Sequence, residues 1–69
     1  MPIYLANCYE EVTIIKITGN DEIRRHLKEM GFVVGEKIMV LQKVNENIIV
    51  KIKGVSLGIG RDLAKRILV

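Results

Sequence analysis

Cysteine and aromatic residues are scarce in this 69-residue sequence, and each shortage excludes a class of protein. Cys8 is the one cysteine, so no internal disulfide can form, and a reducing compartment such as the cytoplasm is expected. The aromatic residues are two tyrosines and one phenylalanine, with no tryptophan. This leaves little surface for stacking on nucleic-acid bases, and no nucleic-acid partner is expected.

Long apolar runs are also missing. No stretch approaches the roughly 20 apolar residues that span a bilayer. Residues 1–8 have neither a basic start nor a long apolar stretch, so we do not expect a secretory signal peptide. Asn7 does not suit the position before a lipidated cysteine, so lipidation is not expected either. Contact with a membrane is therefore expected only through a protein partner.

The sequence contains no recognisable set of catalytic residues. Cys8 and His26 are the only thiol and imidazole, and no pattern in the sequence brings them together as a nucleophile and its base. Residues 58–63 begin like a dinucleotide-binding fingerprint but lack its third glycine and the long helix that follows it. We therefore predict no catalytic residues and no cofactor, and a protein that binds a partner instead.

The composition that is present is typical of a folded domain, with 49% hydrophobic and 28% charged residues. A chain of this length has core enough for one domain, so residues 1–69 are predicted to fold as a single unit. A core this small gives a free energy of unfolding of about 3–5 kcal/mol. The net charge is +3, and the basic residues are spread along the chain, which favours acidic partners only weakly.

Short segments of strand-like sequence dominate the chain. β-Branched residues over 12–18 predict a first long strand. Ile14 and Ile17 can share one face of that strand only if it bulges or bends sharply between them. Further strands are predicted at 37–44, 48–53, 57–60 and 67–69, with a polar loop at 45–47 and a single helical turn at 61–64.

One helix is predicted between the first strand and the second. Asn20 is a good N-cap, and acidic residues follow it in the first turn, where the helix dipole favours negative charge. Ile23, Leu27 and Met30 recur at i, i+4 and i+7, so one stripe of the helix is expected to face a core. Gly31 supplies the left-handed residue that ends it.

Four or five short strands and one early helix are too few for a two-sheet sandwich. We therefore predict a mostly β fold, a small Src-homology-3-like (SH3-like) barrel of about five strands. Its one α-helix is inserted after the first long strand, and a short helical turn precedes the last strand.

The order of these segments resembles the FeoA family of ferrous iron transport proteins. The resemblance lies in residues 14–19, in residues 24–36 with their helix, glycine, apolar and glycine pattern, and in the closing run 57–69. The family usually has a glycine where this chain has Tyr9. The resemblance implies a non-enzymatic cytoplasmic accessory protein of ferrous iron uptake. Its implied partner is the FeoB-like membrane iron transporter, whose cytoplasmic region is similar to a G protein.

A docking patch for this partner is predicted at the end of the helix and in the loop after it. Three cations lie there beside more apolar residues than one connecting loop needs. The predicted partner-binding residues are Arg24, Arg25, Lys28, Met30, Phe32 and Val33. The alternative that stays open is that Met30 and Phe32 simply cap the barrel.

Three further residues of the helix are weak candidates for a metal site. Glu22, His26 and Glu29 fall at i, i+4 and i+7, so three possible ligands share one face. Arg25 and Lys28 lie beside these carboxylates, which favours a solvated face with screened ion pairs. No metal site is predicted on this basis.

Two other functions stay open at this stage. One is a freestanding regulatory or nucleic-acid-binding small barrel, for which salt-dependent binding to DNA or RNA would be evidence. The other is an iron-responsive, regulator-type domain with weak transition-metal binding, since a related barrel forms the C-terminal domain of iron-dependent repressors. This second alternative depends on analogy of fold alone.

Overall fold

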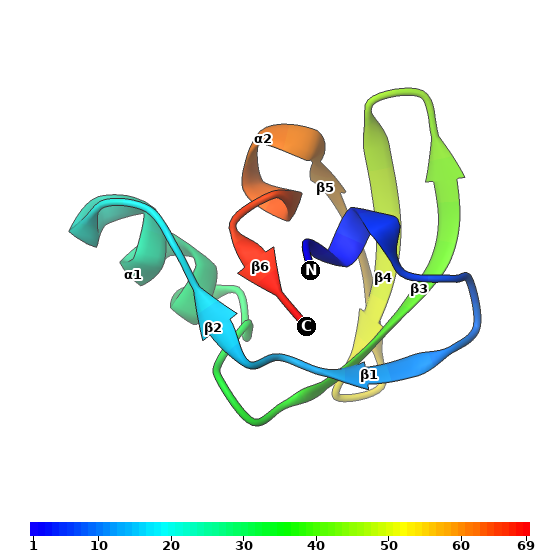
Figure 1. The fold of residues 1–69 in the computed structure, drawn as a ribbon, viewed down its shortest axis with the longest axis horizontal. Coiled ribbons are helices and arrows are strands. Elements are labelled where there is room, and N and C mark those ends of the chain that lie inside the picture. The colour runs from blue at the N-terminus through cyan, green and yellow to red at the C-terminus, as the bar shows by residue number, and fades with distance from the viewer.

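The computed structural model describes residues 1–69 and shows a mostly β chain with six strands and two α-helices (Figure 1). A short 3-10 helix, η1 (Ile3–Leu5), comes first. The remaining elements in chain order are β1 (Glu11–Thr13), β2 (Lys16–Ile17), α1 (Asp21–Glu29), β3 (Lys37–Val44), β4 (Asn47–Ile52), β5 (Val55–Gly60), α2 (Arg61–Ala64) and β6 (Ile67–Leu68).

The strands form two antiparallel sheets. The larger sheet has four strands in the order β1-β3-β4-β5, and the smaller one pairs β2 with β6. In the β3–β4 hairpin Val40 lies opposite Val50, and a register shift between Val40 and Gln42 marks a bulge. The hairpin that the sequence predicts is confirmed, and its turn contains Asn45 with a positive φ of 54°.

The predicted first long strand is wrong in one respect, because residues 12–18 form two short strands in different sheets. β1 pairs with β3, while β2 pairs with β6. Between them Ile14 is fully buried, and its amide donates to the carbonyl oxygen of Glu36 at 2.9 Å. The bend that the spacing of Ile14 and Ile17 requires is therefore large enough to move the chain from one sheet to the other.

The helix follows its local sequence signals closely. The Asn20 side chain accepts a hydrogen bond from the Ile23 amide at 2.8 Å, as an N-cap does. Gly31 follows the helix with a φ of 102°. On the stripe predicted to face the core, Leu27 is fully buried, whereas Ile23 and Met30 pack against the core with only partial burial.

The C-terminal half also matches the sequence closely, with one difference. β5 begins at Val55, two residues before the predicted strand, because Lys53 and Gly54 form a tight turn with positive φ values of 51° and 76°. α2 occupies the predicted helical turn, and β6 provides the last strand.

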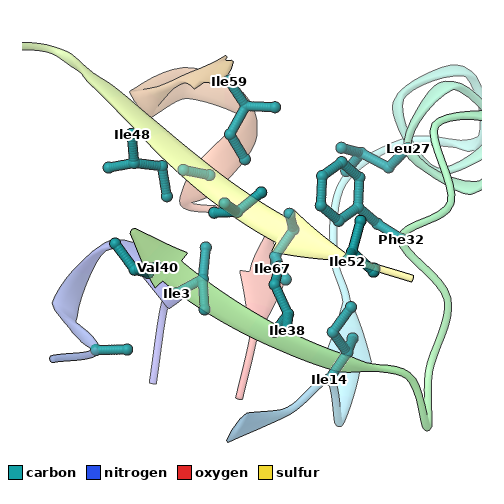
Figure 2. Packing of buried hydrophobic residues seen from close by; sticks show 13 residues of the cluster. Ile3, Ile14, Leu27, Phe32, Ile38, Val40, Ile48, Ile52, Ile59 and Ile67 are labelled. Carbon is teal, nitrogen blue, oxygen red and sulfur yellow. The ribbon is translucent and has the colours of Figure 1, made fainter. Parts of the chain in front are cut away.

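The core contains only apolar residues (Figure 2). It joins the inner face of the large sheet to α1, α2, η1 and β6, and Phe32 lies near Leu27 and Ile52 at one end of it. The thirteen buried residues are Ile3, Ala6, Ile14, Leu27, Phe32, Ile38, Val40, Ile48, Val50, Ile52, Ile59, Ala64 and Ile67.

The N-terminal segment completes this core, which the sequence did not predict. Ile3 and Ala6 are fully buried, and η1 lies beside the larger sheet (Figure 1). Tyr9 adopts a φ of 64°, and its amide donates to the Val40 carbonyl oxygen at 2.7 Å. Neither α-helix has the length and apolar composition needed to cross a bilayer.

Candidate functional site

A shallow hollow of about 410 Å³ lies between β2, α1 and the loop that follows α1. We call it the β2 groove and define it by the residues that line it. These are Ile15, Lys16, Ile17, Arg24, Lys28, Phe32, Val33 and Val34. The lining residues come from three segments that the turn at Gly19 and Asn20 and the stop at Gly31 fold against one another.

Four of the six predicted partner-binding residues line this groove. Arg24 and Lys28 project from α1, and Phe32 and Val33 come from the loop after it. Arg25 is exposed on α1 outside the groove, and Met30 packs against the core instead of lining the groove. The structure therefore groups part of the predicted patch with the β2 strand.

Phe32 needs a correction to its predicted role. Its side chain is 1% exposed and is the largest one in the core, so it supports the groove from below and offers almost no surface to a partner. Replacing Phe32 is expected to change the stability of the domain. The sequence-based alternative, in which Phe32 caps the core, describes its position better.

Sequence reasoning missed three lining residues, namely Ile15, Lys16 and Ile17. Val34, the fourth beyond the predicted set, belongs to the apolar stretch that the sequence places beside the cations. Ile15 and Val34 are each 62% exposed, which is unusual for aliphatic side chains that lie together on one hollow. The sequence did hold one sign of their position, because apolar and polar residues do not alternate regularly over residues 12–18. It places Ile15 outside the core, since Ile14 already occupies the inward position.

The charges of the groove are all of one sign. Lys16, Arg24 and Lys28 contribute three cations, and no acidic residue lines the hollow. Arg24 forms an ion pair with the exposed carboxylate of Asp21, one turn earlier on α1. Lys16 and Lys28 form no ion pair with any residue of the chain. The groove is thus an apolar floor with two free cations beside it.

The other hollows lack this combination because acidic residues line them. In one, Arg61 lies 4.8 Å from the centre of the Tyr4 ring and 3.9 Å from the Glu46 carboxylate. In another, the Lys53 ammonium lies 3.4 Å from the Glu36 carboxylate. Intramolecular partners therefore already satisfy part of the charge at both places.

The candidate metal ligands do not form a site. Glu22, His26 and Glu29 are exposed along α1, and nowhere does the structure bring three or more His, Cys, Asp or Glu side chains together as a metal site would require. Cys8 is exposed, and its backbone forms an isolated β-bridge with Val40 of β3. His26 belongs to α1. The thiol and the imidazole thus stand on different elements.

Comparison with known proteins places this geometry in a family. An Fe(2+) transport protein A of Methanocaldococcus jannaschii is 35% identical over 68 residues, which cover 99% of this chain and 83% of the relative. The solution structure of a FeoA-like protein from Clostridium acetobutylicum is 27% identical with a TM-score of 0.88, covering 99% of this chain and 81% of that one.

A third relative confirms the predicted SH3-like fold. It is the FeoA of Stenotrophomonas maltophilia, solved with zinc and described as a procaryotic SH3 domain protein. It is 25% identical with a TM-score of 0.75, and the match covers 90% of this chain and 80% of that one. The model of the FeoA domain matches residues 1–69. This chain therefore belongs to the FeoA family of ferrous iron transport proteins.

Proposed function

We propose that this protein is a non-enzymatic accessory of ferrous iron uptake that acts in the cytoplasm by binding the cytoplasmic, G-protein-like region of a FeoB-like transporter. Membership of the FeoA family supports the link to ferrous iron transport. In this proposal the protein reaches the membrane only through the transporter. It needs neither a cofactor nor a metal ion of its own.

The observation that carries this proposal is the β2 groove. Ile15 and Val34 expose aliphatic surface, and Lys16 and Lys28 hold unpaired positive charge next to it. Apolar surface bordered by charge is typical of protein interfaces, in which a dry centre supplies affinity and the charged border steers the encounter. The proposed docking residues are thus those of the groove other than Phe32, which supports it from below, with Arg25 and Met30 beside it.

Val34 provides a test that leaves the fold intact. Because Val34 is 62% exposed, Val34→Ser removes apolar surface from the groove with little effect on the core. Val55, which is 56% exposed on β5 outside the groove, gives the matched control Val55→Ser. Calorimetric titration with the purified cytoplasmic region of the transporter is expected to show at least fivefold weaker binding for Val34→Ser and a change below twofold for Val55→Ser.

The cations provide a second test. Lys28→Glu reverses a charge beside the groove, whereas Lys43→Glu makes the same change at an exposed site on β3. We expect Lys28→Glu to weaken binding at least tenfold, and Lys43→Glu much less, because charge pairs act over about a Debye length. Equal effects of the two variants, or no binding by the unaltered protein, would refute the proposal.

A further inference from the structure

The β2 groove follows the edge of a strand instead of covering one of its faces. Side chains alternate between the two faces of a strand, so a hollow over one face is lined by every second residue. Here three successive residues, Ile15, Lys16 and Ile17, all line the hollow. Lys16 and Ile17 are neighbours within β2 and point to opposite faces, so a hollow that both of them line borders the edge of the strand.

This side of β2 has no partner strand. β2 pairs with β6 alone, and the smaller sheet contains no other strand. The Thr18 amide donates to the carbonyl oxygen of Arg66, the residue before β6, at 2.8 Å, so the N–H of Thr18 points toward β6. The Ile15 amide also donates to β6, to the Leu68 carbonyl oxygen at 2.8 Å, so the alternation of hydrogen-bonding direction is interrupted between Ile15 and Lys16, where β2 begins. Within β2, Ile17 lies opposite Ile67 and directly precedes Thr18, so its N–H and C=O point away from β6. These two groups are free to pair with a further strand.

The walls of the groove determine what such a strand would carry. The side chains of Ile15, Val33 and Val34 offer contacts to apolar residues, and Lys16, Arg24 and Lys28 offer contacts to carboxylates. An extended chain presents alternate side chains to opposite sides, so a segment with alternating apolar and acidic residues can place apolar side chains on the face of Ile17 and carboxylates on the face of Lys16.

We propose that the β2 groove is a strand-addition site that takes an extended, acidic segment of the partner protein as a further strand on β2. The segment exchanges two backbone hydrogen bonds with Ile17, and its carboxylates meet Lys16 and Lys28. The identity of the partner rests on the proposed function, whereas the mode of binding rests on the geometry of β2. A second copy of this chain does not fit, because pairing β2 with β2 would bring the two Lys16 ammonium groups and their neighbouring cations together.

A synthetic peptide tests the mode of binding without the transporter. The probe is a capped eight-residue peptide of alternating glutamate and valine, titrated into the 15N-labelled protein. We expect the largest amide shifts at Ile17 and its neighbours on β2, and slower hydrogen exchange of the Ile17 amide. Lys16→Glu is expected to weaken binding at least tenfold, whereas Lys43→Glu serves as the control outside the groove.

Peptide N-methylation separates strand addition from simple charge attraction. Methyl groups on the amides that face β2 block the backbone bonds, whereas methyl groups on the alternate amides leave them intact. Loss of these bonds is expected to weaken binding about tenfold for the first peptide only. Equal affinity of the two methylated peptides would overturn strand addition. Displacement of the peptide by a single-stranded oligonucleotide of equal charge would also overturn it, because binding would then depend on negative charge alone.

The outcomes also separate this inference from the proposed function. If the transporter binds at the groove but N-methylation has no selective effect, the function stands and strand addition is wrong. If the peptide binds with the predicted methylation pattern but the transporter does not bind, the site is right and the proposed partner is wrong.

Discussion

The amide of Gly35 donates a hydrogen bond to the carbonyl oxygen of Ile14 at 2.8 Å. The Ile14 amide in turn donates to the Glu36 carbonyl oxygen, so two hydrogen bonds join the break between β1 and β2 to the loop that precedes β3. This connection holds Ile14 in the core and leaves Ile15 exposed beside Val34. The β2 groove exists because these two loops are fixed to each other.

Gly35→Ala is expected to destabilise the domain by about 1–2 kcal/mol. Gly35 has a φ of 94°, a conformation that costs any residue with a Cβ roughly that amount. No atom lies within 4 Å of the Cβ that alanine would add, so the loss reflects backbone strain alone. Urea unfolding followed by circular dichroism measures it. Gly58→Ala is the control, since its new Cβ meets only the Ile48 carbonyl oxygen at 3.9 Å, and an unchanged midpoint for both variants would contradict the prediction.

Gly19→Ala is expected to cost more, about 2–3 kcal/mol, because strain and crowding act together. Gly19 has a φ of 114°, and an added Cβ would lie 3.1 Å from Cγ2 of Ile23 at the start of α1. The same urea titration compares this variant with Gly35→Ala. A loss no greater than that of Gly35→Ala would show that the Ile23 side chain moves aside freely.

Phe32→Ala is expected to leave the domain largely unfolded at room temperature. Truncating a buried phenylalanine costs about 3–5 kcal/mol, which is comparable to the whole stability of a domain of this size. Phe32→Leu retains most of the buried volume and should remain folded, with a lowered melting temperature. Thermal unfolding and the dispersion of amide signals check both variants; a folded Phe32→Ala with an unchanged melting temperature would show that the side chain is dispensable to the core.

Tyr9→Gly is expected to stabilise the protein by about 0.5–1 kcal/mol. Tyr9 has a φ of 64° and a side chain that is 72% exposed, so glycine relieves backbone strain and sacrifices little packing. Tyr9→Ala keeps the Cβ and is expected to give no such gain. Chemical denaturation of the two variants under identical conditions measures the difference, and a less stable Tyr9→Gly would assign a packing role to the ring.

Much of the fold was predictable because its signals are local. The N-cap at Asn20 and the stop at Gly31 act through neighbours within four residues, and both are confirmed. The β3–β4 hairpin likewise follows from alternating apolar residues on either side of a polar turn. The exact start of β5 was missed because the turn at Lys53 and Gly54 places Lys53 in a left-handed conformation. Lysine is not a residue that predicts this conformation, so the sequence gives no sign of the turn at that position.

The candidate site was predictable only in part. The position of Arg24 and Lys28 beside an apolar loop can be read from a single helix and its end. The contribution of Ile15 and Lys16 cannot, because it depends on β2 leaving the larger sheet and pairing with β6, some fifty residues later in the chain. Phe32 was assigned to the surface for the same reason, since its burial depends on contacts with distant segments.

The sequence by itself determined the mostly β character of the chain, its capped helix and its β3–β4 hairpin. These properties follow from side-chain chemistry and from conformational preferences that operate over a few residues. Only the tertiary structure decided that β1 and β2 separate at Ile14, that Phe32 lies beneath the groove and that one edge of β2 stays unpaired. Such features arise when segments far apart in the chain compete for the same core, and no local preference encodes the result.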